Sequence, residues 1–223
     1  KVILKNINLI IPAYKTIGIV GETGSGKTTT VDIILGLLEA QKGTLEVDDI
    51  IINDKNRRSW QNSIGYVPQQ IYLSDSTISE NIAFGVNENE IKKENVEFAA
   101  KIANLHEFIV NELPLQYQTI IGERGIRLSG GQRQRIGIAR AIYHQPKLLI
   151  FDEATSALDN ITEKAVMEAI HNTDYKITKI LIAHRLSTVK KCDKIFLFEK
   201  GELKHEGTYQ ELLKTSETFS ASV

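Results

Sequence analysis

An eight-residue loop constrains this chain more than any other feature of the sequence. Residues 21–28 read GETGSGKT and match the phosphate-binding pattern G-x-x-x-x-G-K-[ST] at every fixed position. An apolar run of strand length, residues 15–20, precedes the loop, and apolar residues with helical spacing follow it: Val31, Ile34, Leu35 and Leu38. The loop therefore lies between a strand and a helix, as the motif requires. A glycine-rich turn that only connects the two elements is the alternative interpretation.

Each part of this loop has a chemical use. Three glycines let the backbone curl so that successive N–H groups face one concave point beside a helix N-terminus, which attracts phosphate. Lys27 would reach the outer phosphates and take part in catalysis, and the Thr28 hydroxyl would complete a magnesium ligand set that keeps several waters. The predicted contacts with the phosphate ligand are Gly21, Glu22, Thr23, Gly24, Ser25, Gly26, Lys27, Thr28 and Thr29.

Composition excludes several classes of function. The 223 residues carry 27 basic and 28 acidic side chains, so a formal net charge of −1 gives no general attraction to nucleic acid or to an anionic membrane surface. The single cysteine, Cys192, cannot form an internal disulfide, which suits a reducing compartment. Apolar runs are too short to insert across a bilayer. Because the chain starts at Lys1 without a methionine, we expect it to be one part of a longer polypeptide.

The order of apolar patterns predicts an α/β fold with a mainly parallel sheet and an N-terminal antiparallel β part. Strands are expected at residues 2–11, 15–20, 43–47, 50–52, 63–67, 147–151, 179–183 and 194–198. Helices are expected after the loop, near residues 160–171 and 186–191, and throughout residues 71–144. We therefore predict a core made of residues 1–70 and 145–223, interrupted by an all-helical subdomain at 71–144.

Four polar residues follow predicted core strands, where ligands of such sheets bind. Asp152 would hold magnesium, usually through a water, and Glu153 would orient or deprotonate the attacking water. His184 could hydrogen-bond the outer phosphate, and Gln69 could report the state of the ligand to the helical part. The alternatives are that the two acids start a helix, that His184 is a turn residue, and that Gln69 caps a turn.

A second motif, Leu128-Ser129-Gly130-Gly131-Gln132, has the spacing of a capping box. Ile136, Ala139 and Tyr143 then lie on one helical face, so Ser129 is predicted to begin a helix. Gly130 and Gly131 have no side chains to block an approaching anion. The motif is consistent with a second phosphate-binding helix end, although a plain capped helix would give the same pattern.

Taken in order, these motifs resemble the nucleotide-binding domain of ATP-binding cassette (ABC) transporters, which has a P-loop NTPase (RecA-like) core. The resemblance rests on GETGSGKT at 21–28, Gln69 in VPQQ, LSGGQ at 128–132, KLLIFDE at 147–153, SALD at 156–159 and His184 in LIAHRLS. It implies ATP and Mg²⁺ as ligands, with Gln69 also near the metal. It further implies that two domains pair head to tail, so that Ser129, Gly130, Gly131 and Gln132 contact the ATP of the partner and Asp159 bridges the pair.

The segment at 119–125, TIIGERG, is similar to one that exporter-type members carry where they meet the membrane half. The resemblance thus implies an exporter or a lipid flippase, with this domain on the cytoplasmic face of the inner membrane and an attached membrane domain outside this chain. Two intact half-sites favour a homodimer. The alternatives are a soluble ABC-type clamp, against which the lack of sustained heptads in residues 71–127 argues, and a nucleotide switch that does not hydrolyse ATP.

Overall fold

A computed structural model describes residues 3–122, 126–154, 158–171, 176–183 and 186–221. The chain folds as two compact units, one made of residues 1–64 with 177–223 and the other of residues 65–176. The first unit contains β1 (Thr16–Gly21), α1 (Lys27–Ile34), β2 (Glu46–Val47), β3 (Ile50–Ile51), α2 (Arg57–Gln61), β8 (Thr178–Ile182), α8 (Leu186–Val189), β9 (Lys194–Glu199), β10 (Glu202–Gly207), α9 (Tyr209–Thr215) and α10 (Glu217–Ala221).

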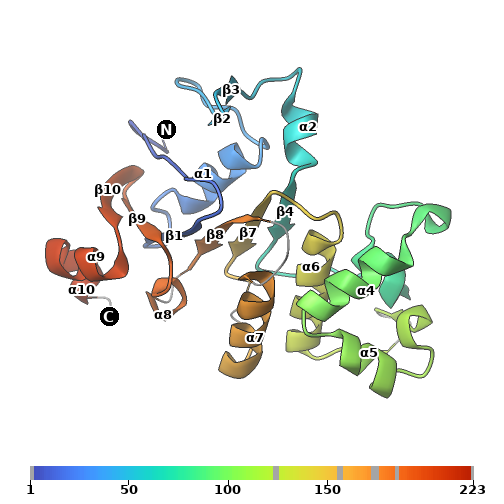
Figure 1. The fold of residues 1–223 in the computed structure, drawn as a ribbon. Helices are drawn as coiled ribbons and strands as arrows, with labels where there is room; N and C mark the ends of the chain where they lie inside the picture. The colour runs from blue at the N-terminus through green and yellow to red at the C-terminus, as the bar shows by residue number, and fades with distance from the viewer. Residues whose placement is uncertain (1–2, 123–125, 155–157, 172–175, 184–185, 222–223) are drawn as a thin grey trace. The chain divides into compact units, whose positions relative to one another are not determined.

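The strands of the first unit follow the order β10-β9-β1-β8 (Figure 1). β1 is parallel to both β8 and β9, and β10 returns antiparallel to β9. The four central residues of β1 and of β9 and the last four residues of β8 are buried, which fits the nearly continuous apolar sequences of these strands. Helices α1 and α8 both contact β1, and a Cβ at Gly18 would lie 2.9 Å from the Val189 side chain of α8. The close fit holds the carboxyl end of β1, and with it the phosphate loop, in place.

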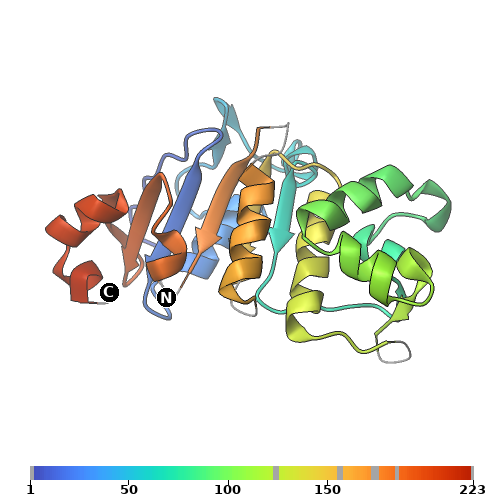
Figure 2. The same cartoon turned by 60° about the horizontal axis from the view of Figure 1, so that its bottom comes forward.

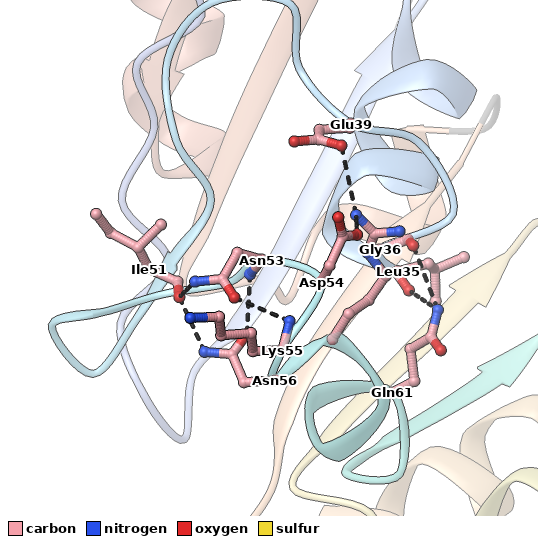
Figure 3. A network of polar contacts seen from close by, with 10 residues as sticks. Leu35, Gly36, Glu39, Ile51, Asn53, Asp54, Lys55, Asn56 and Gln61 are labelled. Carbon is pink, nitrogen blue, oxygen red and sulfur yellow. Dashed lines mark hydrogen bonds and ion pairs between the residues drawn. The ribbon is translucent and has the colours of Figure 1, made fainter.

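The end of α1 is held by α2 through polar contacts (Figure 3). Gln61 donates from Nε2 to the carbonyl oxygens of Leu35 (3.2 Å) and Gly36 (3.3 Å), which no longer have partners within the helix. The Trp60 ring nitrogen donates to the Ile34 carbonyl at 2.7 Å. Arg57 pairs with Asp54 at 2.6 Å. These bonds tie the helix that follows the phosphate loop to the next part of the chain.

The second unit is built on a 13-residue helix, α6 (Gly130–Ile142). Its other elements are β4 (Ile64–Val67), β5 (Ser76–Thr77), α3 (Ile78–Ile82), η1 (Glu88–Glu90), α4 (Lys93–Ile102), α5 (His106–Glu112), η2 (Gln116–Gln118), β6 (Ile120–Ile121), β7 (Leu148–Asp152) and α7 (Asn160–His171). Helices α3 and α4 pack on α6 (Figure 2). Arg140 of α6 donates to the carbonyls of Asn81 (2.9 Å) and Tyr72 (3.0 Å), so it ties α6 to the segment before α4.

The predicted α/β class is confirmed, with a mainly parallel sheet and a small antiparallel hairpin, β2–β3. The strand expected at 2–11 is wrong, since residues 3–12 form no strand in the structure. Asn6 has φ 49°, which breaks an extended run, and Ile3 and Ile10 are exposed rather than packed on a sheet. The description of 71–144 as all-helical is also wrong, because β5 and β6 form a two-stranded antiparallel ladder there. β10, α9 and α10 were not expected.

Candidate functional site

The backbone of residues 21–26 needs glycine at the positions where glycine occurs. Gly21, Gly24 and Gly26 have φ angles of 149°, 79° and 104°, a region that L side chains rarely adopt. A Cβ at Gly21 would lie 2.2 Å from the Phe198 carbonyl oxygen, and one at Gly26 would lie 2.5 Å from Leu4. The loop ends at the N-terminus of α1, whose N-cap, Gly26, has no side chain that could cap the helix. N–H groups at a helix N-terminus are donors for an anion.

Lys27 and Ser25 give this loop the chemistry of an anion site. The Lys27 side chain is 6% exposed, and its Nζ donates to the carbonyls of Gly21 (2.7 Å) and Glu22 (3.0 Å), so its ammonium lies over the loop. Ser25 is 3% exposed, and its Oγ has no hydrogen-bond partner among the described residues. A buried hydroxyl without a partner costs about 1–3 kcal/mol, and a bound phosphate oxygen would remove that cost. The residues present therefore fit a phosphate ligand.

In the second unit, two adjacent carboxylates lie at the end of β7. Asp152 is the last residue of the strand, and Glu153 follows it with φ 53°. A glutamate in this left-handed region is strained by about 1–3 kcal/mol, and such strain is concentrated at functional sites. Each carboxylate accepts a hydrogen bond from a neutral donor near β4: Gln69 Nε2 to Glu153 Oε2 at 2.9 Å, and Tyr66 Oη to Asp152 Oδ2 at 3.0 Å. The structure thus brings Gln69 and Glu153 together.

Side chains of the types that bind Mg²⁺ occur in both units. The described residues hold no group of three or more His, Cys, Asp or Glu side chains that could bind a metal. Mg²⁺ keeps several waters and needs only one or two carboxylates besides substrate phosphates. Asp152 and the exposed Thr28 are side chains of the required type.

The expected capping box at Ser129 is confirmed. Ser129 is the N-cap of α6, its Oγ accepts from the Gln132 N–H at 3.2 Å, and Gln132 Oε1 accepts from the Ser129 N–H at 2.8 Å. Gly130 is exposed, and a Cβ built on it would meet no described atom within 4 Å. The packing of the described residues therefore gives no reason for glycine at this position. An outside partner that approaches the helix end closely would give one.

Asp159 has a local role that the sequence patterns did not reveal. Its Oδ1 accepts from the N–H groups of Ile161 (3.1 Å) and Thr162 (2.9 Å), and its Oδ2 accepts from Thr162 Oγ1 (2.7 Å). The bond from the Thr162 hydroxyl is the main reason why the pKa of Asp159 is lowered. Asp159 thus caps the start of α7; the spacing Asp-x-x-Thr before an apolar-periodic run could have indicated this.

Some expected residues lie outside the described ones. These are His184, residues 123–125 of the segment before LSGGQ, and residues 155–157, which include the start of SALD. Conversely, Tyr66 was missed by sequence reasoning. The one feature that could have indicated Tyr66 is its position three residues before Gln69. On β4 it lies between the buried Gly65 and Val67, so its side chain is on the less buried face of the strand.

Comparison with known proteins shows the family to which this chain belongs. The family model described as "ABC transporter" matches residues 4–156. The chain belongs to this ABC transporter family. It is a nucleotide-binding domain with the P-loop core, and its relatives and structural neighbour are of the exporter type.

Two relatives and one solved structure illustrate this. The chain is 42% identical over 217 residues to the ATP-dependent lipid A-core flippase of Pectobacterium atrosepticum, covering 97% of the chain and 37% of that protein. It is 40% identical over 217 residues to mouse ATP-binding cassette sub-family B member 5, covering 97% of the chain and 17% of that protein. A bacterial Atm1-family ABC exporter with ATP bound has a TM-score of 0.91 and 35% identity, covering 99% of this chain and 38% of that one.

The chain therefore spans well under half the length of these relatives. Among the described residues, no helix is both long and apolar enough to cross a membrane.

Proposed function

We propose that this chain binds and hydrolyses ATP as the motor domain of an ABC exporter, and that two copies pair on ATP to drive an attached membrane domain. The observation that carries the proposal is the phosphate loop. It combines a glycine-dependent backbone, an ammonium held over the loop and a buried serine hydroxyl without a partner. Family membership supplies ATP as the phosphate ligand.

In this proposal the loop residues Gly21–Thr29 hold the phosphates. Lys27 turns its ammonium from the loop carbonyls to the outer phosphates, and Ser25 Oγ donates to a phosphate oxygen. Thr28, Asp152 and Gln69 would hold Mg²⁺, directly or through water. When bound, the ion neutralises charge on the phosphates.

Glu153 acts as the general base. It accepts a proton from a water whose oxygen bonds to the outer phosphorus, while the bond from that phosphorus to the bridging oxygen breaks and ADP leaves. The hydrogen bond from Gln69 Nε2 supports this role, because it orients the Glu153 carboxylate. His184 is proposed to hydrogen-bond the outer phosphate.

Pairing of two copies is proposed to complete the site. Ser129, Gly130, Gly131 and Gln132 contact the ATP held by the partner, and Asp159 contributes at the interface. Two observations support this: the N-terminus of α6 is exposed, and a methyl group at Gly130 would meet no described atom. A helix N-terminus with a free approach is an anion-binding end.

The proposal extends to the assembly in which this domain works, and the names of the relatives support its cargo. We propose a homodimer attached to a membrane domain at the cytoplasmic face of the inner membrane, with a lipid or lipid-linked cargo, because several relatives are named lipid A-core flippases. Residues 71–144 are proposed to form the subdomain that carries LSGGQ and meets the membrane half. Nucleic acid is not an expected partner of a chain with a net charge of −1.

The direct test is phosphate release by the purified chain in Mg-ATP. Glu153→Gln keeps the shape of the side chain and removes its basic carboxylate, so we expect turnover to fall by at least about a hundredfold with ATP binding retained. Glu88→Gln, at an exposed glutamate of η1, is the matched control and should leave turnover unchanged. Phosphate release by the Glu153→Gln variant at the unmodified rate would overturn the role of Glu153.

A further inference from the structure

Tyr66 makes a contact that the proposed mechanism does not use. Its hydroxyl donates to Asp152 Oδ2 at 3.0 Å, and both residues lie in the second unit. A phenol O–H donates a hydrogen bond, and a carboxylate oxygen accepts one. The bond therefore has a fixed direction, and it occupies one of the two oxygens of the residue that the sequence assigns to magnesium.

The main chain around Tyr66 is tightly held. β4 is the neighbour of β7 in the sheet, and Val67 is fully buried. A Cβ at Gly65 would lie 2.4 Å from the Ala141 carbonyl oxygen and 2.9 Å from Leu149 of β7, so β4 approaches α6 and β7 too closely for any side chain there. Since side chains alternate along a strand, Tyr66 points to the other face, where it is 36% exposed. A rigid strand thus presents the phenol to Asp152.

Each of the two carboxylates accepts one of the two hydrogen bonds from donors near β4. Gln69 reaches Glu153, and Tyr66 reaches Asp152. Groups that hydrogen-bond a metal-binding carboxylate orient it and tune its affinity for the ion. We propose that Tyr66 is a positioning residue: by donating to Oδ2, it fixes the orientation of the Asp152 carboxylate and so raises the affinity with which that carboxylate would bind Mg²⁺. The inference rests on the proposed function, and it assigns Tyr66 to the orientation of a metal-binding carboxylate.

The test compares nucleotide binding in the presence of Mg²⁺ with nucleotide binding in its absence. Tyr66→Phe removes only the hydroxyl and keeps the ring. Binding of a non-hydrolysable ATP analogue to the purified chain is measured while MgCl₂ is titrated, and again in EDTA. We expect the Mg²⁺ concentration for half-maximal binding to rise by about tenfold in the variant, with affinity in EDTA and melting temperature unchanged. Tyr72→Phe, at a tyrosine that is 84% exposed, is the control and should match the unmodified chain.

Other outcomes discriminate further. An unchanged Mg²⁺ requirement in Tyr66→Phe, alongside clear Mg²⁺-dependent binding by the unmodified chain, overturns the inference and leaves the proposed function standing. An equal loss of affinity with Mg²⁺ and with EDTA also overturns it, because a purely structural role would weaken both. If the unmodified chain binds the analogue in neither condition, the proposed function and the inference fall together.

Discussion

The helix that begins with LSGGQ offers a substitution that separates folding from function. Gly130 is the first residue of α6, its φ is not in the left-handed region, and a Cβ there would meet no described atom within 4 Å. Alanine is favoured over glycine in a helix by up to about 1 kcal/mol. Gly130→Ala should therefore leave the stability of the chain unchanged or raise it by less than about 1 kcal/mol, a shift in melting temperature of at most about 2–4 °C.

Function should respond in the opposite direction. If the N-terminus of α6 closes on the phosphates of a partner's ATP, a methyl group at position 130 occupies the approach path. We expect at least about a tenfold loss of phosphate release, because stabilising contacts of this kind are worth roughly 2–4 kcal/mol. Binding of ATP to the isolated chain should not change, since the phosphate loop is untouched. The assays are thermal melting, nucleotide titration and phosphate release on one preparation.

Gly137→Ala is the matched control within the same helix. A Cβ at Gly137 would lie 2.3 Å from Ile71 Cδ1, so this variant should be destabilised by about 1–3 kcal/mol. Gly130→Ala would refute the reasoning in either of two ways. Destabilisation equal to that of Gly137→Ala would mean that the chain's own packing requires the glycine. Normal stability together with undiminished phosphate release would mean that no partner approaches this helix end.

Three further results are expected. Lys27→Ala should weaken ATP binding by at least about tenfold in a nucleotide titration, since charge-assisted bonds to phosphate are lost, whereas Lys42→Ala at an exposed lysine should not; equal affinities would count against the role of Lys27. Gly21→Ala should lower the melting temperature, because its Cβ would lie 2.2 Å from the Phe198 carbonyl oxygen, and an unchanged melting curve would contradict that geometry. Burial lowers the pKa of Lys179 from its ordinary 10.5, so the unfolded chain holds this proton more tightly and stability should rise with pH up to about that value. In urea unfolding at pH 7.5 and 9.5, Lys179→Met should be at least as stable as the unmodified chain and should gain less with pH; an equal gain would exclude Lys179 as the source.

Features with a local cause could be predicted from the sequence. The phosphate loop and the capping box at Ser129 each depend on residues within a few positions of one another, and the structure confirms the cap. The central strands could be predicted because β1, β8 and β9 are buried along their length and carry continuous apolar runs. The strands expected at 43–47 and 50–52 correspond to the β2–β3 hairpin, whose turn is formed by Asp48 and Asp49 with φ 49° and 63°.

Features that depend on distant contacts could not be predicted. Residues 3–12 have the alternation of a strand, but a strand also needs a continuous ladder, and Asn6 turns the chain out of the extended region. The bond between Tyr66 and Asp152 joins residues 86 positions apart, and that between Gln69 and Glu153 joins residues 84 apart. No local pattern specifies such a pair. The sequence could name the two carboxylates and Gln69, but not Tyr66 and not which donor pairs with which carboxylate.

The central claim is that ATP pairs two copies of this chain through the phosphate loop and LSGGQ. Its most direct test is light scattering of the Glu153→Gln variant, which should bind ATP without hydrolysing it, in Mg-ATP and in Mg-ADP. The account predicts twice the mass of the 25.0 kDa chain in Mg-ATP and a monomer in Mg-ADP. A monomer in both nucleotides, with ATP binding shown on the same sample, would contradict it.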